Sequence, residues 1–254
     1  MTGQQADNDS QPLTNIAATL KSAASFEKNG KYESALMSLE EILSLNENCA
    51  EAWLIKGVIL GKLGKCEESL KSLNKSLGLN PNYTDAWRLK AATYSTMNLH
   101  DKAADCMSKA VDLEPNNMEL RCSLAASYQK LKRFEDARKC YEEVLRQKPE
   151  DAQIHYLVGI MLGNLENYEE ALKSFEHALR LKPDFTYALI GKGVVLAKLG
   201  RIDEAKLCAK QTLETKGEPE SGKTDDSNTV IDSIRKEYAD VRRRFRKSFS
   251  PNPE

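Results

Sequence analysis

Apolar and small residues recur along the chain with the spacing of helices that bury one face. Between residues 50 and 63 these positions are Trp53, Gly57, Leu60 and Gly61. The spacing i, i+4, i+7, i+8 is that of one helical face. Residues 67–79 repeat this pattern, and Gly64 between them suits the left-handed turn that ends a helix. No segment alternates apolar and polar residues with period 2, so we expect helices and essentially no strand.

A repeat of 34 residues extends this helix–turn–helix pattern along the chain. It is marked by Pro81, Pro115, Pro149 and Pro183. The position 24 residues before each proline is small, namely Gly57, Ala91, Ala125 and Gly159. The position eight residues before each proline is bulky, namely Leu73, Met107, Tyr141 and Phe175. A period of this length predicts stacked helical hairpins, in which large side chains fill the space beside small ones where helices cross closely.

The same phase extends outward and predicts six repeats within residues 16–219. Their expected boundaries are 16–49, 50–83, 84–117, 118–151, 152–185 and 186–219. Gly30, Asn98 and Gly200 occupy, in their own repeats, the position that Gly64 occupies in the second repeat. Asparagine tolerates the left-handed conformation next best after glycine, so we expect the same turn in these repeats.

The residues outside the repeats are of different character. We expect residues 1–15 to be disordered or frayed, 220–228 to be a linker, and 248–254 to be a tail. Residues 229–247 predict an amphipathic helix with an apolar stripe formed by Val230, Ile231, Ile234, Tyr238, Val241 and Phe245. This helix either caps the last repeat or presents a basic surface that includes Arg242, Arg243, Arg246 and Lys247.

The repeats resemble the tetratricopeptide repeat in their pattern of small, bulky and proline positions. The residues that carry the resemblance are Trp53, Gly57, Leu60, Ser69, Leu73, Pro81, Trp87, Ala91, Tyr94, Ala103, Met107 and Pro115. Lys56, Lys90 and Lys192 depart from it, since the family usually has leucine there. Their aliphatic stems can cover the neighbouring helix while the ammonium groups reach water. The resemblance implies an all-α, right-handed α-solenoid whose first helices line a concave groove that holds other proteins.

The groove-facing positions of the first helices define the candidate binding site. They include Leu54, Val58, Arg88, Tyr156, Ile160, Tyr187, Ile190 and Val194. The last two repeats are the apolar and aromatic part, which suits an apolar stripe from a partner helix or an extended peptide. A segment of the chain itself could lie there instead. In the alternative interpretation, Tyr156, Ile160 and Ile190 only pack among neighbouring helices or beneath a cap.

Composition and motifs give little support for other functions. The chain has 37 basic and 38 acidic residues, so its net charge of -1 provides no global field for nucleic acid or a membrane. Gly217, Gly222, Lys223 and Thr224 match the phosphate-loop pattern, but we expect a helix before them where that loop needs a strand. The six cysteines and three histidines match no zinc or catalytic spacing. We therefore expect no metal, no cofactor and no small-molecule substrate.

These observations together predict a noncatalytic adaptor that binds a protein or peptide partner. Two alternatives stay open. One is a docking or regulatory subunit of an enzyme complex, and the other is contact of the basic C-terminal helix with an acidic partner, RNA or a membrane. Without an apparent secretory signal or a long apolar run, the sequence predicts a cytoplasmic protein. It does not identify the partner or the oligomeric state.

Overall fold

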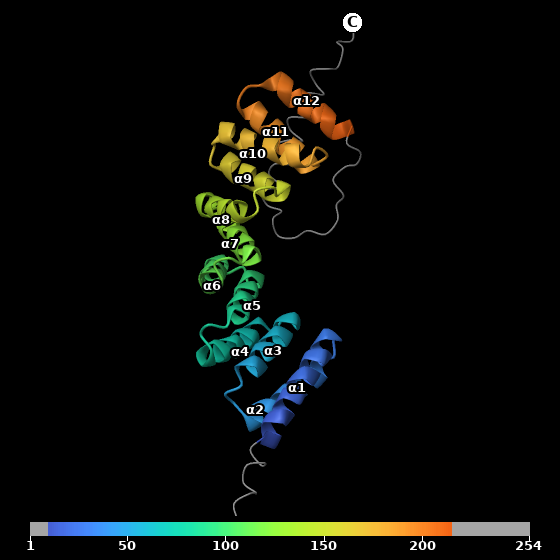
Figure 1. Cartoon of the computed structure of the whole chain (residues 1–254), viewed down its shortest axis with the longest axis vertical. Helices are drawn as coiled ribbons and strands as arrows, with labels where there is room; N and C mark the ends of the chain where they lie inside the picture. Colours follow the sequence, from blue (N-terminus) through green and yellow to red (C-terminus); the bar gives the residue numbers. More distant parts are fainter. Residues whose placement is uncertain (1–9, 215–254) are drawn as a thin grey trace, which may run out of the picture. The chain divides into compact units, whose positions relative to one another are not determined.

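The computed structural model describes residues 10–214, which form twelve α-helices and no strand (Figure 1). Two compact units divide the chain, one ending at Asn116 and the other beginning at Asn117. The helices of the N-terminal unit are α1 Ser10–Lys28, α2 Tyr32–Leu45, α3 Ala50–Lys62, α4 Cys66–Leu79, α5 Thr84–Thr96 and α6 His100–Leu113. Those of the C-terminal unit are α7 Met118–Lys130, α8 Phe134–Gln147, α9 Ala152–Asn164, α10 Tyr168–Leu181, α11 Thr186–Lys198 and α12 Ile202–Glu214.

The helices alternate with the 34-residue period that the sequence predicts. The odd-numbered helices after α1 begin at Ala50, Thr84, Met118, Ala152 and Thr186. The even-numbered helices begin at Tyr32, Cys66, His100, Phe134, Tyr168 and Ile202. Each odd-numbered helix is therefore the first helix of a hairpin, and the next helix is the second. α1 begins at Ser10, earlier than the expected start of the first repeat at residue 16.

Within each unit, hairpins stack by placing a second helix against the next first helix. In the N-terminal unit, α2 packs on α3 and α4 packs on α5, while the first helices α1, α3 and α5 also touch one another in sequence. In the C-terminal unit, α8 packs on α9, α10 packs on α11, and α9 touches α11. A stack of this kind leaves the first helices side by side on one surface. The all-α repeat fold expected from the sequence is thus confirmed.

Close contact between a small residue and a large one joins the two helices of a hairpin. A Cβ atom placed on Gly57 in α3 would lie 2.8 Å from Leu73 Cγ in α4. A Cβ atom on Gly159 in α9 would likewise lie 2.8 Å from Phe175 Cε1 in α10. Real Cβ atoms do not approach other atoms so closely, so a methyl group at either position would force Leu73 or Phe175 to move. The structure therefore confirms the predicted pairing of small and large positions.

The turn inside each hairpin contains one residue in the left-handed conformation. Gly30, Gly64 and Gly200 have φ values of 71°, 75° and 77°, and Asn98 has a φ of 59°. Lys132 and Glu166 take the same conformation, with φ values of 58° and 62°. Neither residue type favours this conformation, so the packing of the hairpins imposes it on them.

The three lysines that depart from the family pattern have their charged groups engaged. Lys56 Nζ lies 3.5 Å from Glu40 Oε1 and 5.7 Å from the centre of the Trp53 ring. Lys90 Nζ lies 5.1 Å from the Trp87 ring centre, and Lys192 Nζ lies 2.9 Å from Glu176 Oε1. Contacts with rings and carboxylates thus accommodate a cation where leucine is usual.

Several predicted elements lie outside the described residues. These are the linker at 220–228, the helix at 229–247 with Arg242, Arg243, Arg246 and Lys247, and the tail at 248–254. The phosphate-loop pattern that begins at Gly217 also lies outside them. Of the twelve helices described here, none combines the length and the apolar character needed to span a bilayer.

The left-handed turns give a first prediction. Replacing Lys132 by glycine should raise the free energy of unfolding by about 0.5–1 kcal/mol, because glycine adopts this conformation without steric cost. The control is Lys139→Gly in the exposed part of α8, which should lower it by about 1 kcal/mol through lost helix propensity. Urea unfolding followed by circular dichroism measures both. Equal destabilisation by the two changes would contradict the strain at Lys132.

The contact between Gly159 and Phe175 gives a second prediction. Gly159→Ala should destabilise the chain by about 1–3 kcal/mol, because the added methyl group overlaps the Phe175 ring. Gly163→Ala in the same helix is the control, since its Cβ would lie 3.9 Å from Val195 and meet ordinary van der Waals contact. That variant should be neutral or more stable by up to about 1 kcal/mol. Thermal unfolding distinguishes the two variants, and a neutral Gly159→Ala would refute the close contact.

Candidate functional site

Five of the predicted groove residues come together on two neighbouring first helices of the C-terminal unit. Tyr156 and Ile160 are one turn apart on α9, and Tyr187, Ile190 and Val194 follow one another at turn spacing on α11. We call this set the α9–α11 face. Tyr187 is half-buried and the other four side chains are buried. The face carries no charged residue among its five members.

An aromatic cluster fixes one end of the α9–α11 face. The ring of Tyr156 lies 5.1 Å from that of Phe185, 6.0 Å from that of Phe175 and 6.3 Å from that of Tyr187, measured between centroids. Such tilted contacts orient the rings as well as burying them. Tyr156 therefore serves in packing between helices, and Tyr187 is the more accessible aromatic side chain of the face.

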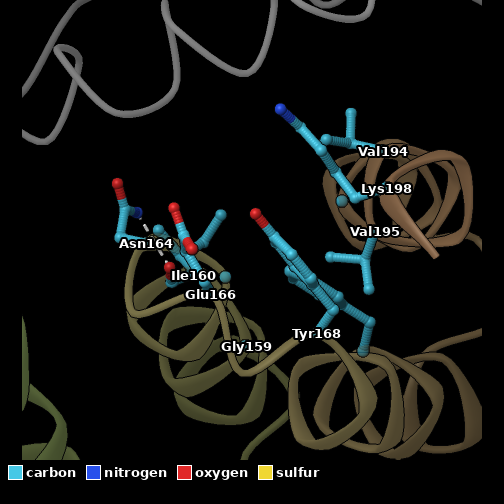
Figure 2. Close-up of a pocket in the computed structure, with 11 residues that line it drawn as sticks. Gly159, Ile160, Asn164, Glu166, Tyr168, Val194, Val195 and Lys198 are labelled. Atoms are coloured by element: carbon cyan, nitrogen blue, oxygen red, sulfur yellow. Dashed lines mark hydrogen bonds between the residues drawn. The ribbon is translucent and has the colours of Figure 1, made fainter.

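A pocket of about 220 Å³ opens at the other end of the face, between α9, α10 and α11 (Figure 2). Its wall includes Ile160 and Val194, and Phe175 forms part of its lining. Gly159, Gly163 and Gly191 add no side chain to the lining, which keeps the space open. The pocket is large enough for a bulky apolar side chain from a bound segment.

Polar groups surround the mouth of this pocket. Figure 2 shows the side chains of Asn164, Glu166, Tyr168 and Lys198 extending past its apolar lining. Asn164 Nδ2 donates a hydrogen bond to the carbonyl oxygen of Ile160 at 2.9 Å, which holds its side chain at the end of α9. An apolar floor with polar groups at the rim is the usual form of a binding site for a side chain or peptide.

The predicted groove residues of the N-terminal unit are not arranged as one apolar surface. Leu54 is buried in a core cluster with Leu73, Leu77 and Ala86. Val58 is half-buried, while Arg88 is exposed and pairs with Asp85 at 3.0 Å. This part of the site therefore offers less apolar surface than the α9–α11 face.

Two of the three histidines, His155 and His177, make hydrogen bonds that hold their rings in place. His155 Nε2 lies 2.8 Å from the carbonyl oxygen of Pro149, as Trp87 Nε1 does from that of Pro81. The His155 ring stacks on His177 with 4.0 Å between centroids, and Arg180 donates to His177 Nδ1 at 2.9 Å. Burial, His155 and Arg180 together lower the pKa of His177. His155 thus replaces a tryptophan of the repeat, and this pair contains no nucleophile.

Three of the six cysteines, Cys106, Cys140 and Cys208, are buried, and Cys49, Cys66 and Cys122 are half-buried. Burial raises the pKa of the Cys106, Cys122 and Cys208 thiols, and it raises that of Cys140 to about 11. A thiol that stays protonated is a poor nucleophile and a poor metal ligand. Within residues 10–214, His, Cys, Asp and Glu side chains form no group of three that could hold a metal ion.

Stacked hairpins with an open first-helix surface define a helical-repeat protein, and the comparisons agree. The family model for the N-terminal tetratricopeptide-repeat region of Psidin matches residues 26–162, more than half of the chain. The model for the middle tetratricopeptide-like domain of cilia and flagella-associated protein 70 matches residues 122–239. The chain therefore belongs to the tetratricopeptide-repeat family, as its repeat pattern predicts. No curated protein sequence matches it significantly.

Solved structures of repeat proteins share this fold. The crystal structure of YrrB, described as a tetratricopeptide-repeat protein with an unusual peptide-binding site, is 18% identical with a TM-score of 0.61. That similarity covers 78% of this chain and 97% of YrrB. MamA has a TM-score of 0.60 at 18% identity, over 67% of this chain and 93% of MamA. A structure of MamA from Desulfovibrio magneticus RS-1 has a TM-score of 0.59 at 19% identity, over 65% and 94%.

The pocket was not predicted from the sequence. The signal that could have indicated it is the presence of Gly159, Gly163 and Gly191 on first helices, since glycine inside a helix lowers stability and therefore suggests that the space is needed. Phe175 explains Gly159 and Gly191, since their Cβ atoms would lie 2.8 and 2.6 Å from its ring. Gly163 has no such contact, and it is the residue whose missing side chain enlarges the pocket.

The cysteine environments give a third prediction. Iodoacetamide at pH 8 should modify Cys140 at least about 100-fold more slowly than a free cysteine, because its pKa is about 11 and little thiolate is present. Half-buried Cys66 is the internal reference. The rate at Cys140 should rise with pH, and urea should remove the difference between the two sites. Peptide mass spectrometry follows both, and equal rates in the native chain would contradict the burial of Cys140.

Proposed function

We propose that the chain is a noncatalytic adaptor that binds an apolar helix or peptide of a protein partner on the α9–α11 face. The observation that supports this most is the pocket of about 220 Å³ beside Ile160 and Val194. Partner segments of this kind are bound through a few apolar side chains inserted between helices. The pocket supplies a place for one such side chain, and its polar rim supplies hydrogen bonds for orientation.

The rest of the face favours a segment rather than a small molecule. Tyr187, Ile190 and Val194 continue the apolar surface along α11, over a length that exceeds the pocket itself. A peptide could place further apolar residues along this line, whereas a small ligand would use only the pocket. We propose exposed Arg88 and half-buried Val58 as partner contacts of the N-terminal unit by itself.

The experiment uses a substitution that narrows the pocket from its rim. Asn164 is exposed at the end of α9, so Asn164→Trp should place an indole across the mouth without disturbing the core. Lys173→Trp adds the same side chain at an exposed position of α10 and is the matched control. Peptides that bind the full natural chain are first selected from a displayed random library. These peptides should bind the Asn164→Trp variant at least about tenfold more weakly than the natural chain, and they should bind the Lys173→Trp variant as tightly as the natural chain.

Calorimetry on selected peptides measures this difference. Apolar or aromatic residues should recur in the selected peptides, because the pocket and Ile190 accept such side chains. Peptides that bind both variants equally would remove the pocket from the binding site. The proposal as a whole would be refuted if no selected peptide bound at the α9–α11 face.

A further inference from the structure

We propose that residues 229–247 of the same chain dock on the α9–α11 face and compete there with the partner. This inference rests on the proposed function, because it assigns an intramolecular occupant to the same surface. Three observations support the inference. They are the burial of side chains on α11, the residue types at equivalent positions of the other repeats, and the amino-acid composition of the segment that follows α12.

More side chains of α11 are buried than contact with its neighbouring helices explains. α11 contacts α9, α10 and α12. Its buried residues nevertheless include the consecutive runs 188–191 and 193–196, which go all the way round the helix. A helix that is apolar and buried on every side needs a neighbour on every side. The described helices supply three neighbours, so a fourth is expected along Ile190 and Val194.

At the same positions of the repeat, α5 and α7 carry residues that are exposed. Arg88 on α5 is equivalent to Tyr156 and Ile190, and Ala92 on α5 and Ala126 on α7 are equivalent to Ile160 and Val194. Arg88, Ala92 and Ala126 are all exposed. Leu54 and Val58 on α3 stand at the same two positions, where Leu54 is buried and Val58 is half-buried, so burial there varies from repeat to repeat. On α9 and α11 all four of these positions are apolar and buried, which no other two neighbouring first helices of the described chain repeat.

Residues 229–247 have the composition of such a cover. Val230, Ile234, Tyr238, Val241 and Phe245 recur at helical spacing and form an apolar stripe. A helix of this length is roughly 28 Å long at 1.5 Å per residue, enough to cross two helices that lie 8–10 Å apart. The other segment outside the description, residues 1–9, reads MTGQQADND and offers no such stripe.

The connection to α12 is long enough for this arrangement. Fully extended, residues 215–228 reach roughly 45 Å at about 3.3 Å per residue. α12 ends at Glu214 and packs on α11, which packs on α9, so the face lies in the same unit as the start of the connection. The rim of the pocket holds Glu166 and Lys198, one charge of each sign. The apolar stripe, rather than the basic residues, therefore selects this surface.

The alternative position for the segment is the outer side of α12, as a cap. α10 packs on α11 with Phe175 against Gly191, and both Leu172 and Phe175 are buried. The equivalent residues of α12 are Lys206 and Ala209. These two side chains offer little apolar surface to a further helix, and the exposed large apolar residues of α12 are Ile202 at its start and Leu207. The chemistry of α12 therefore favours docking on the α9–α11 face over capping.

The test measures backbone hydrogen exchange in the purified full chain, without any partner. Ile234→Ser combined with Tyr238→Ser should raise exchange in α9 and α11 by about tenfold, and leave α3 and α5 unchanged. A short tether gives an effective concentration on the order of 1 mM, so a docking Kd of about 0.1 mM keeps the segment bound about ten to one. Asp232→Ser with Lys236→Ser, on the opposite side of the helix and without change in net charge, is the control.

Three outcomes would overturn the inference. The first is that the double variant leaves hydrogen exchange in α9 and α11 unchanged, and the second is that its exchange changes in α12 alone. The third is that the protection of the natural chain falls on dilution, which would indicate docking between two chains. If the inference holds, a synthetic peptide of residues 229–247 should restore protection to the double variant, and the same peptide with both serines should not. Selected peptides should also bind the double variant about tenfold more tightly than the natural chain. Since exchange requires no partner, failure here leaves the proposed partner site to be judged by its own experiment.

Discussion

The fit between one small residue on a first helix and one large residue on a second helix is the contact on which the fold depends. Gly57 against Leu73 and Gly159 against Phe175 leave no room for even a methyl group. This contact sets how closely the two helices approach, and so it fixes the angle at which the hairpin presents its first helix. In every hairpin the turn between the two helices contains one residue in the left-handed conformation. Lys132 and Glu166 show that this conformation occurs even where the residue type opposes it.

Because these contacts lie inside hairpins, the outward positions of the first helices are left to vary. Arg88 and Ala92 on α5 occupy the same repeat positions as Ile190 and Val194 on α11, in helices that begin 34-residue multiples apart. The packing positions of both hairpins are unaffected by this difference. A repeat fold can therefore keep one scaffold and change only the chemistry of its surface, which is why fold and function are separable in this chain.

The division between packing and surface positions also decides what could be predicted from the sequence. Packing residues repeat, so the period, the helix type and the pairs such as Gly159 and Phe175 could all be found without a structure. Lys132 and Glu166 could not, since lysine and glutamate carry no turn signal. Leu54 and Tyr156 were assigned to the groove by phase, yet their burial depends on which neighbours approach them. The pocket was missed because it arises from three helices together, with Gly163 as the one visible trace.

An apolar first-helix surface is costly unless something covers it. A partner provides that cover only while it is bound, and an uncovered stripe of this kind promotes association of unfolded or neighbouring chains. A tethered segment of moderate affinity resolves the conflict, because it covers the surface in the absence of the partner and still yields to a stronger ligand. Under this proposal, α9 and α11 are suitable first helices for the contact, because both belong to the same unit as the start of the connection. A short connection would keep the effective concentration of the segment high.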